Sequence, residues 1–243
     1  MPLMQGRIPA ISVIIPTFQE EEYVATTLSI LTSVKSPIEV IVVDGGSQDN
    51  TVKIAKRFTN KVYKLSERGI SKARNYGVKW SSADIIVFLD ADVIPPKDLV
   101  EKVIETFKDP TVVGATCTIM PSRPRLAEKM FFLFYNQLIR ISSAFPITRF
   151  KRHSRGEFLA VRKREFQKVG GFNESIACLE DYDLASRLAT LGKFAFMKNL
   201  TVHESMRRIR KLGLFKTVWI WSVNFLSYVL RGEPIAEVWQ PVR

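Results

Sequence analysis

One stretch decides the fold: residues 85–92, which read IIVFLDAD. The five apolar residues Ile85–Leu89 predict a strand buried on both faces of a parallel sheet. Ligands bind open α/β sheets beyond the carboxyl ends of the strands, so Asp90 and Asp92 are expected at a ligand site. Alternate residues of an extended chain point the same way, and two such carboxylates need a positive partner. A divalent cation with oxygen ligands fits them, and it would neutralise a diphosphate.

Strand and helix patterns alternate on both sides of this stretch. Strands are expected at Ile11–Ile15, Glu39–Val43 and Lys61–Leu65, and helices at Glu20–Val34, Asn50–Phe58, Gly69–Trp80 and Lys97–Lys108. This alternation predicts an α/β fold with a mostly parallel central sheet flanked by helices. The pattern changes after Thr118, where we expect an apolar aromatic helix near 130–141, strands at Phe158–Val161 and Phe194–His203, and helices at Glu180–Leu191 and Leu214–Leu230.

The positive charge is confined to the second half of the chain. The 243 residues carry a net charge of +12, and residues 121–243 account for it with 22 basic and 10 acidic side chains, whereas residues 1–120 hold 14 of each. Such a surface favours an anionic partner: phospholipid, a lipid phosphate or nucleic acid. No linker rich in Gly, Ser or Pro divides the chain, so we expect one domain over residues 1–205 and a basic, amphipathic helical extension over residues 206–243.

Cysteine usage and the N-terminus bear on localisation. Cys117 and Cys178 give neither a disulfide framework nor zinc-ligand spacing. The first ten residues contain one arginine and no long apolar core, so no signal peptide is expected. Both observations favour a reduced, cytoplasmic setting.

Six short motifs occur in a fixed order along the chain. They are VIIPTFQEE at 13–21, EVIVVDGGSQDNT at 39–51, ARNYG at 73–77, DAD at 90–92, GGFNE at 170–174 and LEDYD at 179–183. In this order they resemble the family 2 inverting glycosyltransferases, and the likeness covers roughly residues 10–205. The resemblance implies the glycosyltransferase A fold, a nucleotide diphosphate sugar as donor (UDP- or GDP-linked), and Mn²⁺ or Mg²⁺ as cofactor.

The donor is expected at the ends of the first strands. By the resemblance, the nucleotide would be bound by Pro16, Thr17, Phe18, Glu20, Asp44, Arg74 and Asp90. Pro16 fixes the exit from its strand, and Gly45 and Gly46 permit close backbone approach. Arg74 lies on a helix whose N-terminus and cations suit a diphosphate. The alternatives are an ordinary strand-to-helix turn and a solvated basic helix face.

The resemblance also assigns the reacting side of the site. It gives Asp92 and His203 to the metal, Asp181 to the general base, and Arg155, Gly156 and Glu180 to the acceptor side. The base would take the proton from an acceptor hydroxyl as its oxygen attacks the anomeric carbon. A phosphate acceptor is already anionic and needs no base. A surface or core histidine, and acids that only complement a helix dipole, are the alternatives for His203 and Glu180.

Two segments suggest contact with a membrane surface. In the helix expected at Leu214–Leu230, one face carries Lys216, Thr217, Asn224, Ser227 and Arg231, and the rest carries Trp219, Trp221, Phe225, Leu226, Tyr228 and Val229. Arg207, Arg208, Arg210 and Lys211 stand just before it. A broad apolar face behind a basic cluster is typical of a helix lying in the interface. The segment around Met130–Tyr135 is similar, and packing on the domain or in a dimer is the alternative for both.

The sequence thus predicts a metal-dependent inverting glycosyltransferase that acts on a hydroxyl or lipid-linked acceptor by single displacement, peripheral on the cytoplasmic face of a membrane. One alternative is a polyprenyl-phosphate sugar synthase, with phosphate as the nucleophile. Another is a non-catalytic, membrane-associated binder of nucleotide sugars. The basic stretch 149–155 could hold an anionic acceptor head group. A nucleic-acid partner is not expected, because no nucleic-acid motif accompanies the charge.

Overall fold

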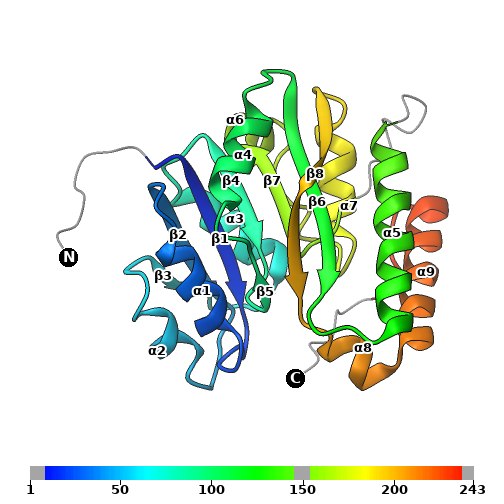
Figure 1. Ribbon diagram of the computed structural model, residues 1–243, viewed down its shortest axis with the longest axis horizontal. Coiled ribbons are helices and arrows are strands. Elements are labelled where there is room, and N and C mark those ends of the chain that lie inside the picture. Colours follow the sequence, from blue (N-terminus) through cyan, green and yellow to red (C-terminus); the bar gives the residue numbers. More distant parts are fainter. Residues whose placement is uncertain (1–8, 145–153, 237–243) are drawn as a thin grey trace.

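The computed structural model describes residues 9–144 and 154–236, which form one eight-stranded sheet (Figure 1). The strand order is β3-β2-β1-β4-β7-β6-β8-β5. The strands are β1 (Ile11–Thr17), β2 (Ile38–Asp44), β3 (Val62–Lys64), β4 (Ile85–Leu89), β5 (Val93–Ile94), β6 (Val112–Pro121), β7 (Phe158–Arg162) and β8 (Lys193–Glu204). β4 lies between β1 and β7, in the middle of the order, as its apolar sequence requires.

Helices cover both faces of the sheet. One face is covered by α1 (Val24–Ser33), α2 (Thr51–Ala55) and α4 (Leu99–Phe107), and the other by α3 (Ile70–Lys79), α6 (Lys163–Lys168) and α7 (Glu180–Leu188). Side chains of β1 alternate between the two layers: Val13 and Ile15 join the first core, and Ile14 joins the second. Two apolar cores therefore hold the sheet between helix layers.

The mostly parallel sheet predicted from the sequence is confirmed. β3, β2, β1 and β4 pair in parallel, β6 pairs in parallel with β8, and β7 runs antiparallel to both β4 and β6. The sequence did not predict β5, β6, α6 or α8. β6 was missed because Gly114, Ala115 and Thr116 interrupt its apolar pattern. The chain is crowded at Gly114, where a Cβ would lie 2.8 Å from the Phe194 ring.

The strand directions bring distant segments to one edge of the sheet. β1 and β2 end in register at Thr17 and Asp44. β7 runs the opposite way, so its first residue, Phe158, pairs with the last residue of β4, Leu89. Residues that follow β1, β2, β4 and β8 and residues that precede β7 therefore share this edge.

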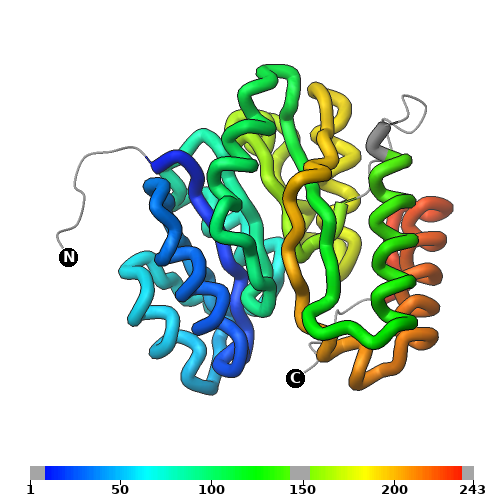
Figure 2. Tube along the Cα trace, viewed as in Figure 1, coloured from blue at the N-terminus to red at the C-terminus, as the bar shows by residue number. Residues whose placement is uncertain are grey.

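The C-terminal extension is helical, as predicted. α8 (Arg207–Leu212) leads through Gly213 into α9 (Leu214–Arg231), which stands beside α5 (Leu126–Ala144) at one end of the molecule (Figure 2). Phe132 of α5 packs with Met206 and Ile209 in a small separate core. Of the helices in the described part of the chain, none is long and apolar enough to cross a membrane.

Candidate active site

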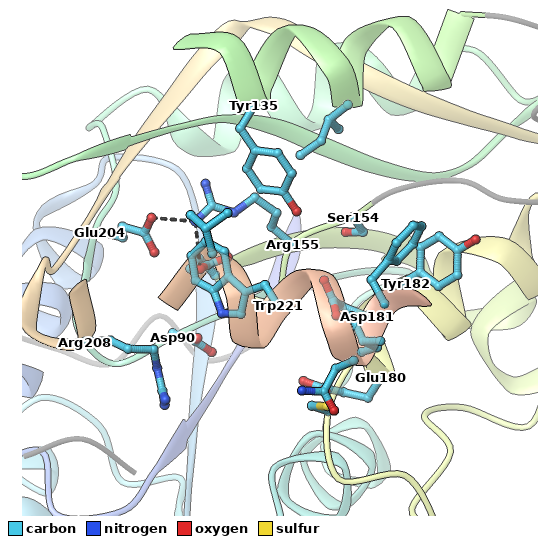
Figure 3. A pocket seen from close by; sticks show the side chains of 18 of the residues that line it. Asp90, Tyr135, Ser154, Arg155, Glu180, Asp181, Tyr182, Glu204, Arg208 and Trp221 are labelled. Carbon is cyan, nitrogen blue, oxygen red and sulfur yellow. Dashed lines mark hydrogen bonds and ion pairs between the residues drawn. The ribbon is translucent and has the colours of Figure 1, made fainter. Parts of the chain in front are cut away.

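A cavity of about 740 Å³ opens at this edge of the sheet (Figure 3). Its polar wall comes from the end of β4, the residues before β7, the end of β8 and the start of α7, and its apolar wall comes from α5 and α9. Seven site residues predicted from the sequence line it: Arg74, Asp90, Asp92, Arg155, Gly156, Glu180 and Asp181. The fold thus joins residues that are up to about a hundred positions apart in the chain.

Arg74 connects three of these segments. Its guanidinium Nη1 donates to Glu180 Oε1 at 2.8 Å, and Nη2 donates to Asp90 Oδ1 at 2.8 Å and to the Gly156 carbonyl at 2.7 Å. The side chain is 1% exposed. Burial acts to lower the Arg74 pKa, but the charges of Asp90 and Glu180 outweigh it and the pKa is raised. In this structure Arg74 therefore aligns the acidic residues of the wall.

Asp181 lies in the first turn of α7, where the chain enters the helix through an unusual backbone conformation. Leu179 has φ 64°, a left-handed conformation that costs a non-glycine residue about 1–2 kcal/mol. It turns the chain so that Leu179, Glu180 and Asp181 all line the cavity. Burial and the charges of Glu180 and Glu157 raise the pKa of Asp181 well above its usual range, and Arg74 opposes them. A carboxylate of raised pKa is a stronger base.

Asp90 and Asp92 are the acids that directly follow β4. Burial, opposed by Arg74, raises the pKa of Asp90 to about 7, and burial, opposed by Arg207, raises that of Asp92 to about 6. Within residues 9–144 and 154–236, no group of three His, Cys, Asp or Glu side chains could hold a metal by itself. Mg²⁺ commonly binds through one or two carboxylates plus substrate phosphates. Asp92 therefore fits a cation that arrives with a diphosphate.

Arg155 forms a second buried charge cluster that the sequence did not predict in full. Its Nη2 donates to Glu157 Oε1 at 2.9 Å and to Glu204 Oε1 at 2.5 Å, and its guanidinium lies over the Tyr135 ring at 5.4 Å. Burial raises the pKa of Glu204 well above its usual range, whereas Arg155 and the hydrogen bond from Glu204 overcome burial and lower that of Glu157. No motif marked either glutamate in the sequence.

The loop predicted to hold the nucleotide base is organised by Asp44. Its carboxylate accepts hydrogen bonds from Thr17 Oγ1 at 3.0 Å, from Ser47 N at 2.9 Å and from Gly46 N at 3.1 Å, and it is fully buried. Thr17 and Asp44 therefore shape the loop in this structure. The ring of Phe18 lies 4.4 Å from the Arg68 guanidinium carbon.

Five of the predicted donor residues do not line the cavity, namely Pro16, Thr17, Phe18, Glu20 and Asp44. Of these, Glu20 is still connected to it, through Arg207. The remaining predicted residue, His203, pairs with Ile94 on β5, is exposed and lies outside the cavity lining, while its neighbour Glu204 points in. Most of the basic stretch 149–155 falls outside the described residues.

The apolar wall of the cavity is aromatic. Phe131 and Tyr135 of α5 stack with ring centroids 5.8 Å apart, and Trp221 of α9 lies 6.4 Å from each. Phe134, Leu138, Val218 and Phe225 extend this wall. A ligand that fills the whole cavity would therefore meet acids on one side and apolar rings on the other.

The outer faces of α5 and α9 are unusually apolar. In α9 the polar residues Thr217, Asn224 and Ser227 are buried and hydrogen-bonded. Thr217 Oγ1 donates to the Gly213 carbonyl, Ser227 Oγ donates to the Glu233 carbonyl, and Asn224 Oδ1 accepts from Ala236 N. The large apolar side chains that remain exposed on the two helices are Leu126, Met130, Leu133, Phe134, Leu138, Ile141, Phe215, Trp219, Leu226, Val229 and Leu230. Most of the polar stripe thus faces the protein, and the apolar face points outward.

Comparison with known sequences gives a consistent family. The family described as "Glycosyl transferase family 2" matches residues 12–170. Glycosyltransferase AglE of Haloferax volcanii is 38% identical over 112 residues, which are 42% of this chain and 37% of that protein. Poly-beta-1,6-N-acetyl-D-glucosamine synthase of Staphylococcus epidermidis is 32% identical over 97% of this chain and 51% of its own length. The chain therefore spans about half or less of these two relatives.

A third relative is matched over more of its length. Dolichol-phosphate mannosyltransferase of Pyrococcus furiosus is 33% identical over 92% of this chain and 70% of that protein. Among solved structures, a mannosyltransferase of Pyrobaculum calidifontis in complex with GDP-Man and Mn²⁺ superposes with a TM-score of 0.72, at 22% identity, over 94% of this chain and 66% of that one. At this identity the superposition shows a common fold.

Proposed function

Since this chain belongs to glycosyl transferase family 2 and has the glycosyltransferase A fold, we propose that it transfers a sugar from a nucleotide diphosphate sugar to an acceptor, with inversion at the anomeric carbon. The observation that carries the proposal is the single cavity in which Asp92 and Asp181 both lie. One acid suits the cation that accompanies a diphosphate, and the other has the raised pKa of a general base.

In this proposal each acid has a distinct role. Asp92 would hold the cation, which would supply positive charge to the departing diphosphate. Asp181 takes the proton from the acceptor oxygen as that oxygen attacks the anomeric carbon from the side opposite the diphosphate. Arg74 holds Asp90 and Glu180 in place by one hydrogen bond to each, so these two acids keep their spacing before the substrate arrives.

The acceptor is expected beyond Asp181, between the acidic and aromatic walls. Within the described residues, Ser154 Oγ and Arg155 Nη1 are buried there without a hydrogen-bond partner. Buried polar groups normally have partners, so these two atoms support a polar acceptor group at this position. The apolar wall beside them suits a lipid-linked acceptor.

The exposed faces of α5 and α9 support docking on a membrane surface. Large exposed apolar patches mark interaction sites, and the second half of the chain supplies the excess positive charge that attracts anionic lipid. On this proposal the protein lies on the bilayer with the exposed faces of these two helices against the lipid, and the same helices line the cavity.

A phosphate acceptor is the second candidate, because one relative is named a dolichol-phosphate mannosyltransferase. The two candidates make opposite predictions for Asp181→Asn. With a hydroxyl acceptor, loss of the base should lower kcat by about 10²-fold or more. With a phosphate acceptor, most of the activity should remain.

The test is nucleotide release from UDP- and GDP-sugars in the presence of a lipid extract or of soluble glycans, for the wild type and Asp181→Asn. A matched control is Asp98→Asn, an exposed acid whose partner is Lys102. Release stimulated by an acceptor would support the transferase. Donor binding without turnover on any acceptor class would favour a non-catalytic binder instead.

A further inference from the structure

Arg207, the first residue of α8, places its guanidinium between two carboxylates at the donor side. Nη1 and Nη2 donate to the two oxygens of Glu20 at 2.7 and 2.8 Å, and Nε lies 3.1 Å from Asp92 Oδ2. The Tyr23 ring lies 4.9 Å from the guanidinium carbon. The exposed fractions are 19% for Arg207, 7% for Glu20 and 13% for Asp92. A bidentate, mostly buried fork of this kind is a specific contact.

This contact departs from what the sequence predicted. Arg207 stands in the basic cluster before α9, which together with the apolar face of that helix suggested a membrane surface. Instead its side chain turns inward, and Arg208 lines the cavity. Arg210 donates to the Arg123 carbonyl at 2.8 Å on the outside. The basic cluster is thus divided: Arg207 and Arg208 face the site, and Arg210 faces the surface.

The position of Arg207 conflicts with a metal on Asp92. Mg²⁺ binds carboxylate oxygens at about 2.0–2.1 Å. A guanidinium nitrogen 3.1 Å from the same carboxylate would then lie within a few ångströms of the ion. Two positive charges at such a distance repel each other strongly in a partly buried site. Arg207 and the cation therefore compete for one carboxylate.

We propose that Arg207 is a resident counter-cation of the donor site, which neutralises Asp92 until the metal and diphosphate bind and then gives this carboxylate up. The inference rests on the proposed role of Asp92 as the metal ligand. After release, the two hydrogen bonds to Glu20 keep the guanidinium beside the donor, where it can pair with a diphosphate oxygen.

Arg207 stands on the segment that joins the donor site to the acceptor side. Met206 and Ile209 of this segment pack with Phe132 of α5, and Arg208 and Ile209 line the cavity.

The test is direct binding of Mn²⁺ in the absence of nucleotide, measured from the electron paramagnetic resonance signal of the free ion. Arg207→Met should bind Mn²⁺ about five-fold more tightly or better than the wild type, at the lower end of couplings between sites. Arg210→Met, a charge-matched change on the same helix, should leave the affinity unchanged. Asp92→Asn added to Arg207→Met should abolish the gain.

Arg207→Lys provides a second variant that keeps the positive charge and should fold even where the methionine variant does not. A lysine side chain cannot bind both carboxylates as the forked guanidinium does. The Mn²⁺ affinity of Arg207→Lys should therefore lie between that of the wild type and that of Arg207→Met. If neither variant binds Mn²⁺ more tightly than the wild type, Arg207 has only a structural role and the inference is wrong. A gain that survives Asp92→Asn would also overturn it.

The experiments distinguish failure of the counter-cation role of Arg207 from failure of the proposed metal role of Asp92. If Asp92→Asn leaves Mn²⁺-dependent nucleotide binding intact in an otherwise wild-type chain, the metal role itself fails. If Asp92→Asn abolishes that binding but the Arg207 variants gain no Mn²⁺ affinity, the function stands and only the counter-cation role fails.

Discussion

Asp181 carries the carboxyl group whose ionisation should set the pH dependence of transfer to a hydroxyl acceptor. Burial and the charges of Glu180 and Glu157 raise its pKa. A base acts in its ionised form, so kcat/KM should fall as the pH drops through this raised pKa, above the range of an exposed aspartate. Glu180→Gln removes one negative neighbour and should lower the Asp181 pKa, which moves the acid limb of the profile to lower pH.

The measurement is a pH profile of kcat/KM for the wild type and Glu180→Gln. Asp109→Asn is a suitable control, since Asp109 is an acid of lowered pKa outside the cavity lining. An acid limb that stays in place or moves to higher pH in Glu180→Gln would contradict the role of Asp181.

Single residues also show which parts of the site could be predicted from the sequence and which could not. Asp90, Asp92 and Asp181 could be predicted because each lies at a strand end or helix start within a short motif. Arg207 and Glu204 could not, because their partners come from other segments, and Glu157, although only two residues from its partner Arg155, stands in no motif. Arg207 is 187 positions from Glu20 in the chain. Only the folded chain shows which of several basic residues turns inward.

At the scale of elements, the contact between α3 and β1 is set by one glycine. A Cβ on Gly77 would lie 2.5 Å from Ile14 Cγ2, so alanine cannot be accommodated without moving the helix or the strand. Overpacking of this kind costs about 1–3 kcal/mol, more than the roughly 1 kcal/mol that alanine gains over glycine in a helix. We expect Gly77→Ala to lower the free energy of unfolding, as measured by urea titration.

Lys79→Ala, an exposed change on the same helix, is the control and should have little effect. A Gly77→Ala variant as stable as the wild type would mean that α3 packs less closely on β1 than the structure has it. Because Arg74 lies one turn away on α3, the variant should also weaken donor binding.

The elements differ in how far sequence predicted them. β1, β2 and β4 were evident because parallel strands buried on both faces read as apolar runs. β6 was not, because small residues at close strand and helix contacts interrupt its pattern. The sequence also identified the polar stripe of α9 but not the direction in which it faces. In the structure Asn224 Oδ1 accepts a hydrogen bond from Ala236 N, and Ser227 Oγ donates one to the Glu233 carbonyl, so both side chains face the chain beyond the helix.

At the scale of the whole molecule, the outward apolar face of α5 and α9 should determine membrane binding. Trp219 and Leu230 are 70% and 73% exposed. Replacing both by serine should lower the partition coefficient onto anionic vesicles, measured by cosedimentation, by about 10²-fold or more, because each buried apolar side chain contributes about 1.5–3 kcal/mol. Leu191→Ser, at an exposed leucine that follows α7, is the control. Equal sedimentation of the double variant and the wild type would show that another face binds the membrane or that none does.

The central claim is that Asp92 binds the cation that accompanies a nucleoside diphosphate. The most direct measurement is calorimetric titration of UDP and of GDP, each with and without Mn²⁺, into the wild type and Asp92→Asn. The account predicts that one nucleotide binds the wild type only with Mn²⁺ and that Asp92→Asn loses this binding. Binding of neither nucleotide to folded protein, or equal binding by Asp92→Asn, would contradict it.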